Sequence, residues 1–231
     1  MSVLFPILHF HSDETPMSWA ARQAAFHTGG RVVPFLNDLK IPVVDLARGK
    51  REAVERLCSI AGQDPAPVFK NTITALGDRR YRLRECEFSA ELTTGLVTRF
   101  CPLCLSEDRD EHALPKAAVR HRLHWRLGPI RTCGKHNIPL ENVRMGKWND
   151  MLHEVQAMDD AVSAAYIAAC SLEPRNPSPL QSYVEDRFKG IPGPVWLDGQ
   201  AIDQACRATE MLGGLMAFGP EQKAAEMTED M

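Results

Sequence analysis

The chain has 231 residues, of which 44% are hydrophobic and 25% charged, with a net charge of -3. These values are typical of a soluble globular protein of one large or two small domains. A slightly acidic chain argues against a nucleic-acid binder that uses its whole surface, although a local basic face remains compatible with it. No apolar run approaches the roughly 18–20 residues of a membrane span. The apolar start at Val3–Leu8 lacks a basic flank and a cleavage site, so we expect a cytoplasmic protein without membrane contact.

Helix signals dominate the N-terminal third. Thr15-Pro16 predicts a helix start, and Gly29-Gly30 predicts its end. Apolar residues at helical spacing predict a further helix ending at Gly62. Asp64-Pro65 predicts the start of another helix that continues to Leu76. The next segment, Tyr81–Phe88, alternates in polarity and predicts a strand.

The C-terminal third also has helical periodicity. Apolar residues from Leu152 to Ala169 form one stripe, which predicts a helix of about 20 residues. Ser178-Pro179 predicts the start of a second helix, and Asp198 can cap a last one with Leu212 and Met216 facing inward. The predicted fold is mainly α and has three parts: an N-terminal helical bundle (1–78), a zinc-ribbon-like module with a little β (79–145) and a C-terminal helical region (146–231).

Three cysteines and a histidine form the clearest motif, C-x2-C-x28-C-x2-H, at Cys101, Cys104, Cys133 and His136. Two thiolates three positions apart can hold one ion, and a second pair completes a tetrahedron. Four sulfur and nitrogen ligands leave no open position for substrate, so the motif predicts one structural zinc ion. A redox C-x-x-C pair is the alternative, but it needs a βαβ context and leaves Cys133 and His136 unexplained.

The segment between the two ligand pairs is basic. Residues 112–140 contain no Asp or Glu, and their candidate contacts to nucleic acid or a partner are Arg120, Arg122, Trp125, Arg126, Arg131 and Lys135. A basic strip with an aromatic residue can face phosphates. Alternatively, Trp125 and Leu127 pack a small core and the arginines are solvated. Both interpretations stay open.

Two motifs resemble the TniQ family of transposition proteins. The family pattern E-S-L-x-S-W-L-x-R is similar to residues 14–22, which match at Glu14, Ser18, Trp19 and Arg22. The family zinc pattern R-x-C-P-x-C-L matches residues 99–105. It is followed by Arg122 with Trp125, by C-x-x-H and by Leu140, as in the family.

This resemblance implies an adaptor without a catalytic centre that helps to choose where a transposon inserts. Such an adaptor sits on DNA or on a guide-RNA complex and recruits an AAA+ ATPase, which brings in the transposase. The related TnsD proteins add a long DNA-reading region, whereas only about 90 residues follow the zinc motif here. Residues 141–150 lack the further Cys pair of many members, so we expect no second zinc site. A homodimer is compatible with these expectations.

Two other functional classes remain as alternatives. One is a zinc-finger transcription regulator outside any transposon, and the other is a redox or hydrolytic metalloenzyme that uses the same cysteines. The sequence contains no G-x-S-x-G, Walker or H-E-x-x-H motif. We therefore predict that the chain is not an enzyme.

Overall fold

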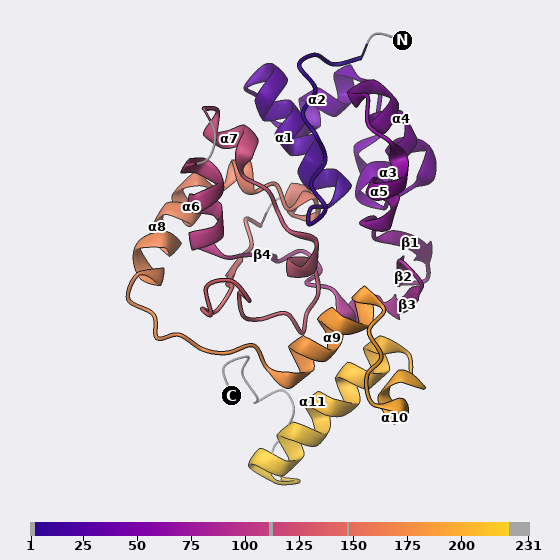
Figure 1. Ribbon diagram of the computed structural model, residues 1–231, viewed down its shortest axis with the longest axis vertical. Coiled ribbons are helices and arrows are strands. Elements are labelled where there is room, and N and C mark those ends of the chain that lie inside the picture. Colours follow the sequence, from indigo (N-terminus) through magenta and orange to yellow (C-terminus); the bar gives the residue numbers. More distant parts are fainter. Residues whose placement is uncertain (1–2, 111–112, 147, 222–231) are drawn as a thin grey trace.

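The N-terminal helices form one side of the molecule (Figure 1). A computed structural model describes residues 3–110, 113–146 and 148–221. Its first helices are α1 (Pro16–Thr28), α2 (Val32–Asp38), α3 (Val43–Ala47), α4 (Arg51–Ala61) and α5 (Pro65–Lys70). The Thr15 hydroxyl accepts a hydrogen bond from the Ser18 amide, which caps α1, and Gly29 ends that helix at φ 63°. The predicted start and end of this helix are therefore confirmed.

A small antiparallel sheet follows the bundle. It has the order β1-β2-β3, with β1 (Thr74–Gly77), β2 (Arg80–Leu83) and β3 (Cys86–Ser89). Two predictions are wrong here. The helix that starts at Pro65 ends at Lys70, because residues from Thr74 pair with β2. The single predicted strand is two strands, because Arg84 adopts φ 54° and reverses the chain.

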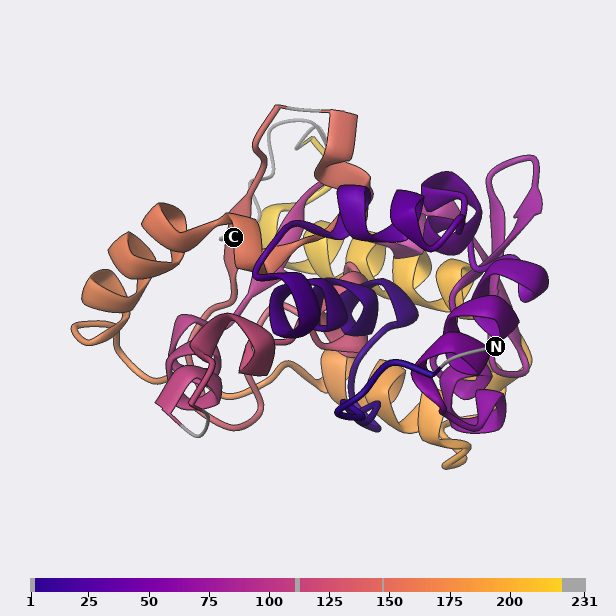
Figure 2. The same ribbon diagram turned by 90° about the horizontal axis from the view of Figure 1, so that it is seen from above.

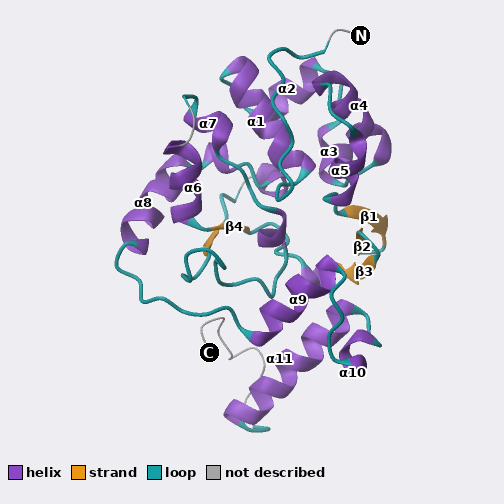
Figure 3. Ribbon diagram, viewed as in Figure 1, coloured by secondary structure: helices purple, strands orange, loops and turns teal. Residues whose placement is uncertain are grey.

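The central module has little regular structure (Figure 3). It contains η1 (Ala90–Leu92), β4 (Thr98–Phe100), α6 (Pro102–Asp110), α7 (Pro115–Ala118), η2 (Leu123–Arg126) and β5 (Glu141–Val143). Strands β4 and β5 pair antiparallel, with Phe100 opposite Glu141. Because Cys101 directly follows β4 and His136 shortly precedes β5, this pairing brings the two halves of the C-x2-C-x28-C-x2-H motif together. Helix α1 lies between the other N-terminal helices and the α6–α7 side of the module (Figures 1 and 2).

The C-terminal segments begin with two partly buried 3-10 turns and continue as helices that pack on the module. They are η3 (Trp148–Leu152), η4 (Val155–Ala157), α8 (Asp159–Ala169), α9 (Pro179–Lys189), α10 (Val195–Asp198) and α11 (Ile202–Phe218). The long helix predicted from Leu152 is wrong, because His153 at φ 50° interrupts it and regular α-helix begins at Asp159. The inward orientation predicted for Leu212 and Met216 is also wrong. These side chains are 53% and 80% exposed, because α11 extends beyond the body of the molecule.

Two hydrophobic clusters form the core. The first lies within the N-terminal helices around the fully buried Trp19, and Leu152 from η3 joins it. The second centres on Phe88, Phe100 and Trp125 and includes residues of α8, α9 and α11. These clusters and the many helices confirm the mainly α fold, while the predicted domain boundaries stay a prediction. Within the described residues, no helix is both long and apolar enough to cross a membrane.

Candidate metal centre

The four residues of the C-x2-C-x28-C-x2-H motif meet at one point. Their ligand atoms all lie within 4.8 Å of one another. His136 Nδ1 is 3.4, 3.3 and 3.6 Å from the sulfurs of Cys101, Cys104 and Cys133, respectively. The sulfurs of Cys104 and Cys133 are 3.6 Å apart, and all three cysteines are buried. These four residues can therefore hold a metal ion.

Local backbone structure positions each ligand pair. Cys101 directly precedes α6, and the Leu105 amide donates to its carbonyl over 3.1 Å, so the helix's first turn carries Cys104 beside Cys101. On the other side, the Asn137 amide donates to the Cys133 carbonyl over 2.8 Å. This hydrogen bond closes a tight turn that places His136 beside Cys133. Each pair is thus set by short-range structure, and the pairing of β4 with β5 joins them.

Glu107 supports the histidine from behind. Its Oε1 atom lies 3.0 Å from His136 Nε2, and its Oε2 atom accepts a hydrogen bond of 2.7 Å from Lys135. With Nδ1 directed at the sulfurs as a metal ligand, Nε2 would carry the proton and donate a hydrogen bond to the carboxylate. A carboxylate behind a ligating histidine fixes the ring's tautomer and orientation. The sequence analysis missed Glu107. Its position three residues after Cys104 on one helix could have indicated that both side chains lie on the same helix face.

The sulfur cluster is electrostatically unfavourable on its own. Hydrogen bonding with the Cys101 and Cys133 sulfurs, followed by burial, raises the pKa of Cys104 far above its usual value. The Cys104 thiol therefore stays protonated on its own, and three thiolates could share this buried cluster only with a cation between them. This requirement agrees with the ligand geometry.

Asp108, the residue after Glu107, organises two of the predicted contact residues. Its carboxylate accepts two hydrogen bonds from Arg122, of 3.0 and 2.9 Å, and one of 2.9 Å from Arg120. The Arg122 guanidinium also lies 4.8 Å from the ring centre of Trp125, which is fully buried. Arg120, Arg122 and Trp125 therefore belong to the interior of the module, where the arginine charges are balanced by acids.

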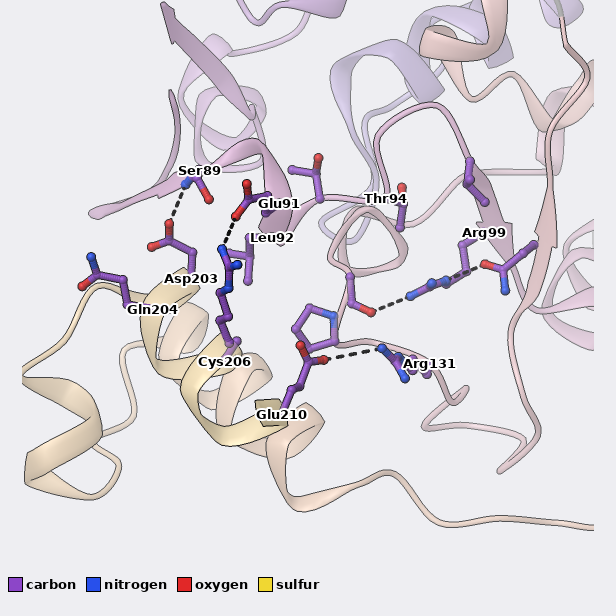
Figure 4. Close-up of a pocket in the computed structure, with 16 residues that line it drawn as sticks. Ser89, Glu91, Leu92, Thr94, Arg99, Arg131, Asp203, Gln204, Cys206 and Glu210 are labelled. Carbon is purple, nitrogen blue, oxygen red and sulfur yellow. Dashed lines mark hydrogen bonds and ion pairs between the residues drawn. The ribbon is translucent and has the colours of Figure 1, made fainter. Parts of the chain in front are cut away.

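The other three predicted contacts lie in different places. Arg126 is partly buried, and burial lowers its pKa to about 10. Arg131 faces a cavity of about 750 Å³ under α11, where Glu210 lies 3.5 Å away (Figure 4). Lys135 is exposed beside the metal ligands. The six residues thus do not form one strip, and their contact with nucleic acid stays a prediction.

The N-terminal motif contacts the metal module directly. Arg22 pairs with Glu14 over 2.7 Å and also donates to the Ala117 carbonyl over 2.8 Å. The Ser18 hydroxyl accepts a hydrogen bond of 2.8 Å from the His121 amide. Burial raises the pKa of Glu14 to about 7, against the opposing effect of Arg22. The residues that match between 14 and 22 therefore join α1 to the segment between the ligand pairs.

Comparison with known proteins agrees with this arrangement. The family model TniQ matches residues 6–140, which include both the N-terminal motif and all four residues that could hold a metal ion. No curated protein sequence matches the chain. Because the match covers more than half of its length, the chain belongs to the TniQ family of transposition-associated proteins.

Proposed function

We propose that this protein is a zinc-containing DNA-targeting adaptor in transposition. It helps to select the insertion site and recruits an AAA+ ATPase, which brings in the transposase. Membership of the TniQ family supports the role in transposition. The cluster of Cys101, Cys104, Cys133 and His136 carries the proposal of a bound ion.

The donor set and its dimensions favour zinc. Zinc binds sulfur at about 2.3 Å and histidine nitrogen at about 2.0–2.1 Å in a tetrahedron. Those bonds imply about 3.8 Å between two sulfurs and about 3.5 Å between sulfur and nitrogen. Four of the six separations between the ligand atoms are 3.3–3.6 Å, close to these values, and all six are within 4.8 Å. Zinc would compensate the charge of the thiolates, and four protein ligands leave it without a position for substrate, so its role is structural and the protein is not an enzyme.

The surface residues suggest how the adaptor works. Direct contact with nucleic acid is proposed for Lys135 and Arg131, whose side chains are exposed, while Arg120 and Arg122 hold the module together. The N-terminal helices are proposed to meet the ATPase. DNA, a guide-RNA complex or a second copy of the chain is compatible with the remaining surface, and a cytoplasmic location fits all of these partners.

Two measurements test this proposal. Elemental analysis of purified protein should find one zinc ion per chain, and affinity capture should retain an AAA+ transposition ATPase together with target DNA. If the protein contains zinc but captures no ATPase, the result would favour the zinc-finger transcription regulator. Metal-free protein with a titratable Cys101–Cys104 disulfide would favour the redox enzyme and contradict the adaptor.

A further inference from the structure

A second cavity lies beside the metal centre. Its volume is about 580 Å³, within the range of about 300–1,000 Å³ common for ligand sites. Segments far apart in the sequence line it: the turn between β2 and β3, the stretch from Arg120 to Leu127, the turn that carries Cys133, and the end of α9. The cavity therefore depends on the assembled module.

Cationic side chains surround the cavity. Arg120 and Arg122 are balanced by Asp108 and by Asp13, which lines the cavity together with one other carboxylate, Glu185. Three further cations also line it: Arg84, Lys135 and Lys189. Lys135 and Lys189 are 64% and 56% exposed, and each has one partly exposed acidic partner. Exposed ion pairs of this kind are worth little, so an incoming anion can replace the acid.

Arg84 provides a cation that is held in place without being neutralised. It donates to the carbonyls of Lys70 and Phe188 and to the side-chain oxygen of Asn71. Among the described residues, no carboxylate lies within ion-pair distance of Arg84. Three neutral acceptors fix the guanidinium but leave its positive charge, which favours an anion in the cavity.

The inner wall of the cavity is apolar. Leu123, Leu127 and Phe188 line it together with Trp125, and all four side chains are buried. The ring of Trp125 supports this wall from within the core, since it is fully buried. An apolar wall in a cavity lined by five cations and two carboxylates suits a group that is flat and apolar at one end and anionic at the other.

From these features we infer that the cavity takes one unpaired nucleotide of a nucleic-acid strand, an inference that rests on the proposed role in DNA targeting. The base lies against the wall formed by Leu123, Leu127 and Phe188, and the flanking phosphates lie near Arg84, Lys135 and Lys189. A paired base inside a duplex cannot enter a concave site, whereas an unstacked one can.

The test measures binding of the full-length, metal-loaded protein to fluorescent strands by anisotropy. A short oligothymidylate should bind at least about fivefold more tightly than an abasic strand with the same number of phosphates, because the base loses its contacts. It should also bind more tightly than the matched duplex. An oligouridylate of the same length shows whether DNA or RNA is preferred. Equal affinity for the intact and abasic strands would overturn the inference.

Substitution of an exposed lysine locates the site. Lys189→Glu should weaken oligothymidylate binding about fivefold or more at 0.1 M salt and reduce the slope of affinity against salt by about 0.7 or more. The matched control is Lys40→Glu, an equal charge change at an exposed position in the turn between α2 and α3, which should leave binding unchanged. Equal effects of the two substitutions would show that the strand does not bind at the cavity.

Two further outcomes separate this inference from the proposed function. If an acidic peptide with an aromatic residue binds in a Lys189-dependent way while no strand does, the cavity is a protein-docking site and the inference fails. If duplex DNA binds and the ATPase is captured, but Lys189→Glu changes neither, the adaptor role stands and only the nucleotide site is lost. Failure of ATPase capture contradicts the proposed function instead.

Discussion

The metal module buries charged side chains, whereas the outer half of α11 exposes apolar ones. In the module, Asp108, Arg122 and His121 are almost completely buried, and each has a hydrogen-bonded partner. In the outer half of α11, large apolar side chains such as Leu212 and Met216 are exposed. Burial of charge is unfavourable unless the partners are accurately placed. The module's stability must therefore depend on a few specific contacts, whereas the end of α11 contributes little to the fold.

Removal of one metal ligand should have the largest effect. Cys104→Ser should abolish stoichiometric metal binding and lower the thermal midpoint by at least about 10 °C, because structural zinc sites contribute several kcal/mol or more to folding. Elemental analysis and thermal denaturation measure the two effects. The control is Cys170→Ser, since Cys170 is exposed and lies outside the cluster. Similar losses in both variants would mean that the four-ligand cluster has no special role in stability.

Neutralisation of Asp108 comes next. Asp108→Asn removes the buried one of the two carboxylates that Arg122 and Arg120 share and leaves them only the more exposed Asp13, so the unfolding free energy should fall by about 3 kcal/mol. Asp110→Asn, at an exposed position of the same helix, should change it by less than about 0.5 kcal/mol. Chemical denaturation of metal-loaded protein compares the two. Equal small effects would show that the acid is dispensable and that metal binding alone holds the module.

Glu107→Gln should act on the metal rather than on folding. The glutamine oxygen can still accept from His136 but lacks the charge that makes the imidazole a better ligand, so zinc affinity should fall about 10- to 100-fold. Competition with a chromophoric chelator measures that affinity. At saturating zinc the variant should unfold near the wild-type midpoint. A lower midpoint with unchanged affinity would make Glu107 a packing residue instead.

Different physical causes explain which parts of this structure could be predicted. The convergence of Cys101, Cys104, Cys133 and His136 could be predicted, because chelation requires particular donors at short spacing whatever the surrounding fold. The contacts of Glu107 with His136 and of Asp108 with the arginines could not be predicted. A carboxylate on a helix is usually solvated, and the partners of these two lie far away in sequence. The capped helices α1 and α9 were predicted from local hydrogen bonds, as the caps at Thr15 and Ser178 show.

Periodicity was less informative than capping, for a reason that the C-terminal region illustrates. An apolar stripe shows which residues share a helix face, but not whether another element covers that face. Leu152 packs into the N-terminal core from a 3-10 turn, and Met216 is exposed on a regular helix, although both belong to apolar stripes. Only the tertiary arrangement separates these two cases.

The smallest effect is expected at the end of α11 and completes the comparison with the module. Met216→Gln should change the unfolding free energy by less than about 0.5 kcal/mol, because its side chain is already 80% exposed and loses no packing. On the same helix, Ile202→Ala should cost about 2–5 kcal/mol, because Ile202 is buried in the second core cluster. Denaturant titration of both variants measures the difference. Since glutamine and methionine have similar helix propensities, a large loss in Met216→Gln would mean that the outer half of α11 is covered by another surface in solution.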